Sequence, residues 1–190
     1  SISELTALAE RLQDLVEEDL LSQAKVRVQS GARELERVLT EAVDSGRFSL
    51  EDIFDEDYQL IPDTEPKKYH TKYDRYLDET IMVYQDEFLK NAMVAFAVLV
   101  DRNGYLPTHN TKFTQPLTGD IEKDKVGNRT KRVFDDPVGL GAAHYDGSDG
   151  NGHLQQSYER DTGEKMWDIS APVFVKGRHW GGFRIGYQMD

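Results

Sequence analysis

The sequence has 190 residues, 38 % hydrophobic and 10 % aromatic, which is enough apolar material for one folded domain and too much for wholesale disorder. Aspartate and glutamate number 35 against 23 lysines and arginines, and the formal charge of −12 argues against a protein that binds nucleic acid. The absence of cysteine excludes disulfides, thiolate zinc sites, c-type haem attachment and cysteine nucleophiles.

No apolar run approaches the roughly 18 residues that span a bilayer, since the longest, at 93–100, has the length of a strand. The chain opens at Ser1 in a helical pattern and finishes directly after a strand-like run. We therefore expect a domain taken from a longer protein.

Residues 2–43 carry apolar side chains at helical spacing, and Gly31 is the only helix breaker in their interior. The apolar positions at the start are Ile2, Leu5, Leu8, Leu12, Leu15 and Val16. This pattern fits either two helices joined near Ser30 and Gly31 or a single long helix. We favour the single helix, and we expect its N-terminal part to pair with a second copy of the chain.

Ser45 and Gly46 end this helical pattern, and residues 55–68 are acidic, contain two prolines and predict a surface loop. Residues 69–89 return to helical spacing with an aromatic stripe, which is typical of a helix packed on the core.

The second half of the sequence changes from helical to strand periodicity. Five strands are predicted, at residues 93–100, 105–109, 153–158, 165–175 and 179–188. Pro107 favours an edge or irregular strand at 105–109. The insertion at 111–152 reads as loop with one short helix around 123–133, so the whole pattern predicts an α+β fold with a five-stranded antiparallel sheet.

Common enzyme motifs are missing: the sequence has no Walker A loop, no His-Glu-x-x-His and no Gly-x-Ser-x-Gly. The segment that starts at Asp146 has the composition of a calcium loop, but its oxygen-bearing residues are out of EF-hand register. The five histidines never fall at i, i+4 spacing in a predicted helix. We expect no metal ion and no other cofactor.

Three clusters could line a binding site. One gathers polar and aromatic groups at 105–110, and another sets Arg129, Lys131 and Arg132 together in an acidic chain, where arginine suits a carboxylate. These cations could instead pair with the nearby acids Asp120, Glu122, Asp124, Asp135 and Asp136. The third cluster places aromatic residues on adjacent strands, as pocket wall or as core. We predict a pocket between the sheet and the 111–152 insertion, lined by Tyr105, His109, Asn110, Arg129, Arg132, Tyr158 and Trp167.

Several longer segments resemble the extracytoplasmic sensor region of bacterial methyl-accepting chemotaxis proteins. They are 101–110 (DRNGYLPTHN), 128–137 (NRTKRVFDDP), the turn at 160–163 (RDTG), 179–187 (HWGGFRIGY) and the helix opening at 69–74 (YHTKYD). The resemblance covers roughly residues 45–188. It implies a single Cache domain with a PAS-like fold, and the lack of cysteine excludes the related sensors that carry covalent haem.

The same resemblance implies a periplasmic sensor without catalysis, tethered by flanking transmembrane helices. Residues 1–44 would form the membrane-proximal dimerisation helix of a homodimer, and residues 45–190 would bind a small molecule such as an organic acid or an amino acid. A sensor of a histidine kinase or a diguanylate cyclase is the alternative with the same fold. A small hydrolase or lyase using His109 with a carboxylate such as Asp168 is the alternative from another class, although no motif supplies its nucleophile.

Overall fold

A computed structural model describes residues 1–160 and 162–188 of the chain. The helix α1 (Ile2–Asp44) is continuous, so the prediction of a single long helix is confirmed and the two-helix alternative is wrong. A capping box begins it, because the side chains of Ser1 and Glu4 each accept a hydrogen bond from the other's backbone nitrogen. Gly31 occupies a helical position with no room for a side chain, because a β-carbon there would lie 2.3 Å from the ring of Phe183. Glycine thus lets α1 approach the sheet closely.

The main sheet is antiparallel and has the strand order β3-β6-β5-β4. Its strands are β3 (Val94–Asp101), β4 (Leu154–Glu159), β5 (Lys165–Val175) and β6 (Arg178–Gln188). Within the described residues it has four strands rather than the five predicted.

The predicted strand at 105–109 leaves the sheet because its backbone pairs with another segment. The N–H of Leu106 donates to the carbonyl of Arg132, and the N–H of Lys131 donates to the carbonyl of Leu106. Pro107 has no N–H to extend the pairing further. The segment therefore crosses in front of the sheet, where it can cover a site.

The remaining elements are short, and together with the loops between them they surround the sheet. They are α2 (Leu50–Ile53), β1 (Gln59–Leu60), β2 (Tyr69–His70), α3 (Asp74–Thr80), α4 (Met82–Glu87), η1 (Phe88–Lys90), η2 (Thr111–Phe113), α5 (Ile121–Gly127) and α6 (Pro137–His144).

Two helix predictions differ from the structure in their extent. The predicted helix at 69–89 begins only at Asp74, because residues 69–70 pair with β1 as strand β2. The predicted helix at 123–133 is the shorter α5, which ends before Asn128. Beyond it Lys131 has a φ of 63°, in the left-handed region, which no α-helix can contain.

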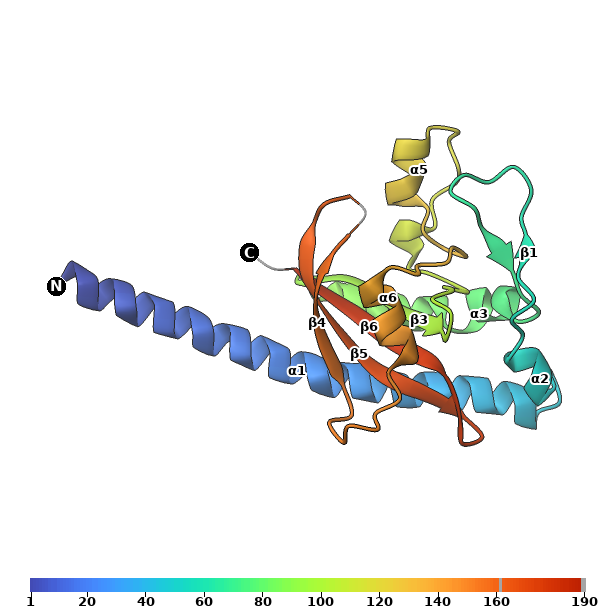
Figure 1. Cartoon of the computed structure of the whole chain (residues 1–190), viewed down its shortest axis with the longest axis horizontal. Coiled ribbons are helices and arrows are strands. Elements are labelled where there is room, and N and C mark those ends of the chain that lie inside the picture. Colours follow the sequence, from blue (N-terminus) through green and yellow to red (C-terminus); the bar gives the residue numbers. More distant parts are fainter. Residues whose placement is uncertain (161, 189–190) are drawn as a thin grey trace.

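The sheet separates two apolar clusters, as strand alternation requires. On one face α1 lies along the strands and packs mainly against β5 and β6, whose buried residues on this face include Ile169 and Ile185 (Figure 1). The opposite face carries Phe96, Val98 and Tyr158, and α6 and the segment 104–134 cover it. The N-terminal half of α1 projects beyond the sheet (Figure 1).

Within the described ranges, no helix combines the length and the apolar character that a membrane crossing needs. Asp161, in the turn that the 160–163 motif predicts, lies outside the described residues. The division of the chain at residues 44 and 45 stays a prediction.

Candidate functional site

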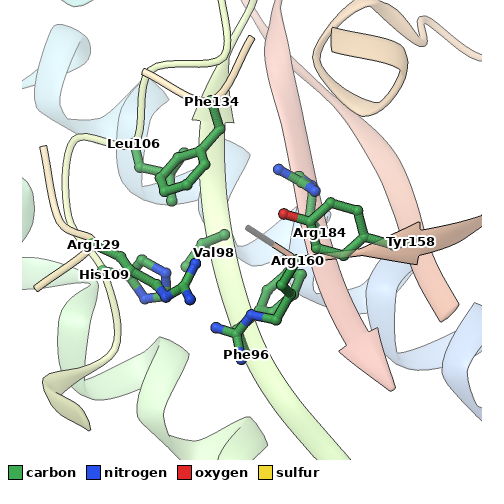
Figure 2. Close-up of a pocket in the computed structure, with 9 residues that line it drawn as sticks. All are labelled: Phe96, Val98, Leu106, His109, Arg129, Phe134, Tyr158, Arg160 and Arg184. Atoms are coloured by element: carbon green, nitrogen blue, oxygen red, sulfur yellow. The ribbon is translucent and has the colours of Figure 1, made fainter. Parts of the chain in front are cut away.

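A small cavity lies on the face of the sheet opposite α1. Its volume is about 20 Å³, roughly the room that one bound water needs. Figure 2 shows its side chains arranged around a central space above strand β3. The lining residues are Phe96, Val98, Leu106, His109, Arg129, Phe134, Tyr158, Arg160 and Arg184. Three arginines and a histidine thus face one enclosed space in a chain whose net charge is −12.

Strand pairing brings the floor of the cavity together. Val98 is opposite Arg184 in the β3–β6 register, and Phe96 is opposite Gly186. A β-carbon on residue 186 would lie 2.3 Å from the Phe96 ring, so glycine leaves the space that this ring fills. The ring of Phe96 consequently lies beside the guanidinium of Arg184, whose Cζ is 5.6 Å from the ring centre.

A buried ion pair fixes Arg184 in place. Its Nε donates to Oδ2 of Asp168 at 2.9 Å, and its Nη2 lies 2.8 Å from the same oxygen. Both residues are buried, with exposed fractions of 2 % and 0 %. Oδ1 of Asp168 and the hydroxyl of Ser170 have no hydrogen-bond partner among the described residues. Such buried polar groups are uncommon and are costly outside a functional or strained region.

Arginines and aromatic rings alternate along the cavity. Phe96 lies near both Arg184 and Arg160, with the Cζ of Arg160 5.5 Å from its ring centre. Phe113 in turn lies near Arg160, at 4.8 Å, and Arg129, at 5.7 Å. Each guanidinium is attracted by a nearby ring, and two of the rings are shared by two cations. This arrangement holds three arginines near one another at a reduced cost in repulsion.

His109 is neutral and has a fixed tautomer. The backbone N–H of Asn110 donates to its Nδ1 at 2.7 Å, so the hydrogen of the neutral ring is on Nε2. Burial, followed by the charges of four arginines, holds the pKa of His109 well below its usual range. The four are Arg160, Arg129, Arg184 and Arg132. The position is therefore strongly electropositive.

The structure brings three of the seven predicted site residues together. His109, Arg129 and Tyr158 all line the cavity, which lies between the sheet and the covering segment that begins at residue 106. Arg132 lies just outside it, with its Cζ 4.5 Å from the ring centre of Phe134, a lining residue. That these side chains bind a ligand stays a prediction.

Two other predicted residues support the loop instead of lining the cavity. The side-chain amide of Asn110 both accepts from the backbone N–H of Ala97 at 3.0 Å and donates to its carbonyl at 3.1 Å. The hydroxyl of Tyr105 donates to the carbonyl of Tyr69 at 2.8 Å. These bonds attach the segment 105–110 to β3 and to β2, and they position His109.

Trp167 lies on the wrong face of the sheet for this cavity. Tyr158 pairs with Met166, whereas Trp167 pairs with Ser157, so the two aromatic side chains point to opposite faces. The indole N–H of Trp167 donates to Glu17 of α1 at 3.2 Å. Adjacent strands were predicted correctly, but the register between them separates the two residues.

Sequence reasoning missed six lining residues: Phe96, Val98, Leu106, Phe134, Arg160 and Arg184. The sequence does contain a signal for Arg184, which is a charged residue within a predicted apolar strand. Such a residue, when buried, needs a partner or a function. Arg160 sits at a predicted turn, where a charged residue is ordinary, so the sequence gives no reason to select it.

Lys131 belongs to a separate network. Its Nζ donates to both carboxylate oxygens of Asp78, at 3.0 and 2.8 Å, and lies 3.0 Å from Asp74. The expected alternative was pairing with acids close in sequence, but these partners come from α3. Lys131 is therefore a structural cation rather than part of the cavity.

Among the described residues, no three histidine or carboxylate side chains come together as ligands of a metal ion would.

No family model matches the sequence, and no curated protein matches it. A solved structure described as an extracellular ligand binding receptor from Desulfohalobium retbaense DSM5692 is 15 % identical, over 85 % of this chain and 24 % of its own, with a TM-score of 0.35. This chain thus spans about a quarter of that receptor's length. A TM-score this low carries no weight for the fold or the function of the chain.

Proposed function

We propose that this chain is the extracytoplasmic sensor domain of a bacterial chemoreceptor and that it binds a small organic anion with a carboxylate group. The observation that carries the proposal is the cavity in which Arg129, Arg160 and Arg184 gather in an otherwise acidic chain. Arginine presents a planar fork of donors that matches a carboxylate. The motif resemblance supplies the chemoreceptor context, with a single Cache fold and a periplasmic location.

The polar groups of the cavity suit an anion better than a cation or a neutral ligand. Two described carboxylates lie next to its arginines, and both are already paired: Asp168 with Arg184, and Glu164 with Arg160. His109 offers Nε2–H as a further donor, because its Nδ1 is occupied. A bound carboxylate would replace part of the repulsion among the cations with charge-assisted hydrogen bonds.

A hydrolase or lyase that uses His109 and Asp168 has less support. A general base must accept a proton, yet the acceptor nitrogen of His109 is occupied by the N–H of Asn110. Asp168 is held by Arg184. A sensor of a histidine kinase or a diguanylate cyclase would share the cavity, so that alternative concerns only the output domain.

Thermal unfolding in the presence of organic acids and amino acids tests the binding function. We expect at least one small carboxylate to raise the midpoint temperature, and Arg129→Lys to weaken that ligand about tenfold or more, because lysine keeps the charge but loses the fork. Lys123→Gln, at an exposed position on α5, is the matched control. If no acid shifts the midpoint, or if Arg129→Lys binds the ligand as the parent does, the proposal is wrong.

We further propose that the chain forms a homodimer through the projecting part of α1. Its exposed apolar residues are Ile2, Leu5, Leu8, Leu12, Leu15 and Val16. A helix turns about 100° per residue, which places this stripe roughly 140° around α1 from the face that packs on the sheet. Leu5, Leu8, Leu12 and Leu15 also follow the 3-4-3 spacing of a coiled-coil seam. The four leucines therefore face away from their own domain, toward a second copy, whereas Val16 lies at the edge of the stripe, beside a hollow that it lines with Met93 and Trp167.

We expect Leu12→Asp to convert the dimer into a monomer, because it buries a charge in the seam. Light scattering after size-exclusion chromatography, over a range of concentrations, measures the change. Thr6→Asp adds the same charge away from the stripe and should leave the mass unchanged. A parent chain that stays monomeric at high concentration would contradict the dimer proposal.

A further inference from the structure

The cavity is too small to enclose a whole organic acid. Its volume of about 20 Å³ is little more than the room of a single water molecule, so at most the carboxylate end of a ligand enters it and the carbon chain behind that end does not. A ligand whose head enters here must place the rest of its atoms in an adjoining space.

Such a space lies next to the cavity. It is a hollow of about 390 Å³ lined by Ala95, Lys112, Arg160, Glu164, Lys165, Met166 and Gln188. Arg160 lines both the cavity and the hollow. In the close-up the side chains of Arg160 and Phe96 overlap, on the side of the cavity away from Leu106 and Phe134 (Figure 2). A ligand that extends from the cavity past Arg160 would therefore enter the hollow.

The hollow is itself positively charged. Lys112 and Lys165 are exposed on its rim, and Nη1 of Arg160 is 3.2 Å from Oε2 of Glu164. Among the described lining residues, one carboxylate thus faces three cations. Glu164 is half exposed, with a side-chain exposure of 53 %, whereas Arg160 is buried. The carboxylate is the partner that can turn away into solvent when a ligand arrives.

We infer that the ligand is an elongated dianion, such as a linear dicarboxylate, with one anionic group in the cavity and the second in the hollow. This inference rests on the proposed anion-binding function of the cavity. The first group meets Arg129 and His109, Arg160 lies between the two groups, and the second group meets Lys112 and Lys165. Two cationic ends joined by a shared arginine match a ligand with two charges, whereas a monoanion would leave the outer lysines unused.

Calorimetric titration with succinate and butyrate, at low ionic strength, tests the inference, because the two acids have equal carbon number and differ by one carboxylate. We expect succinate to bind roughly two- to thirtyfold more tightly, the range for two ion pairs at exposed lysines. A series from malonate to adipate then locates the best chain length. Lys112→Gln combined with Lys165→Gln should bring the ratio of the two affinities close to one, and Lys123→Gln should leave the ratio as in the parent.

The possible results separate the two proposals. Equal affinities for succinate and butyrate would overturn the dianion inference and leave the carboxylate proposal standing. A preference for succinate that survives the double lysine substitution would also overturn it, because the second group would then lie elsewhere. If neither these acids nor any other anion of the screen binds, the proposed function fails together with the inference. Both lysines are exposed, so the double variant is expected to unfold at the same temperature as the parent.

Discussion

Replacing Asp168 by alanine is expected to lower the free energy of unfolding by about 3 to 5 kcal/mol. The change leaves Arg184, only 2 % exposed, without the carboxylate that lies 2.8 Å from its Nη2. An uncompensated charge inside a protein is far more costly than the ion pair it came from. Urea unfolding followed by circular dichroism measures the loss. Glu41→Ala breaks an exposed pair with Arg37 and should cost less than about 1 kcal/mol.

Removing both partners of the pair should nevertheless cost far less than removing one of them. Burial raises the pKa of Asp168 in spite of the adjacent guanidinium, so desolvation outweighs attraction at this carboxylate. Replacing both partners, as Asp168→Leu with Arg184→Met, should therefore recover most of the stability that Asp168→Ala loses. A loss below about 1 kcal/mol in the single variant would contradict this account. A double variant that is both stable and unable to bind the ligand would indicate that Arg184 is retained for binding.

The fold could be predicted from the sequence where one periodicity runs unbroken. The apolar stripe of α1 and the alternating strands β5 and β6 have no competing interpretation. The prediction that 105–109 is a strand of the sheet was wrong. Its sequence resembles a strand, but its backbone hydrogen bonds go to residues 131–132. A sequence shows that a strand-like segment exists, but the choice of its partner depends on long-range packing.

The site was predicted in part for the same reason. The prediction that His109 and Arg129 line the cavity is confirmed. It could be made from residue type alone, because a histidine and an arginine stand out in an acidic, loop-rich segment. Trp167 was grouped with Tyr158 because both are aromatic, and a one-residue offset in register places them on opposite faces. Register is decided by the pairing of whole strands. Residue type alone therefore cannot say which side chains meet.

Between pH 6 and pH 5, His109 alone should lower the free energy of unfolding by up to about 1.2 kcal/mol as the pH drops. The pKa of His109 is well below its usual range in the folded protein, because the ring is buried beside four arginines. In the unfolded chain it titrates near the ordinary value of about 6.5. Below that pH the unfolded state binds one more proton than the folded state, so acid favours unfolding. The contribution of His109 is fully present above pH 6.5 and is lost as the pH falls.

Asp101 acts in the opposite direction and must be separated from His109. Burial raises the pKa of Asp101 to about 6, so its folded form takes up a proton before its unfolded form does, and acid stabilises the fold through this group. The difference in unfolding free energy between the parent and His109→Asn, measured at several pH values, removes the Asp101 contribution because both proteins share it. Asparagine also keeps an acceptor for the N–H of Asn110. We expect the difference to fall by up to about 1.2 kcal/mol from pH 6 to pH 5, whereas a difference that is flat with pH would show that the arginines leave His109 free to titrate normally. A bound anion would offset those arginines, so the same measurement with ligand present should give a smaller slope, and binding should take up protons at pH 5 to 6.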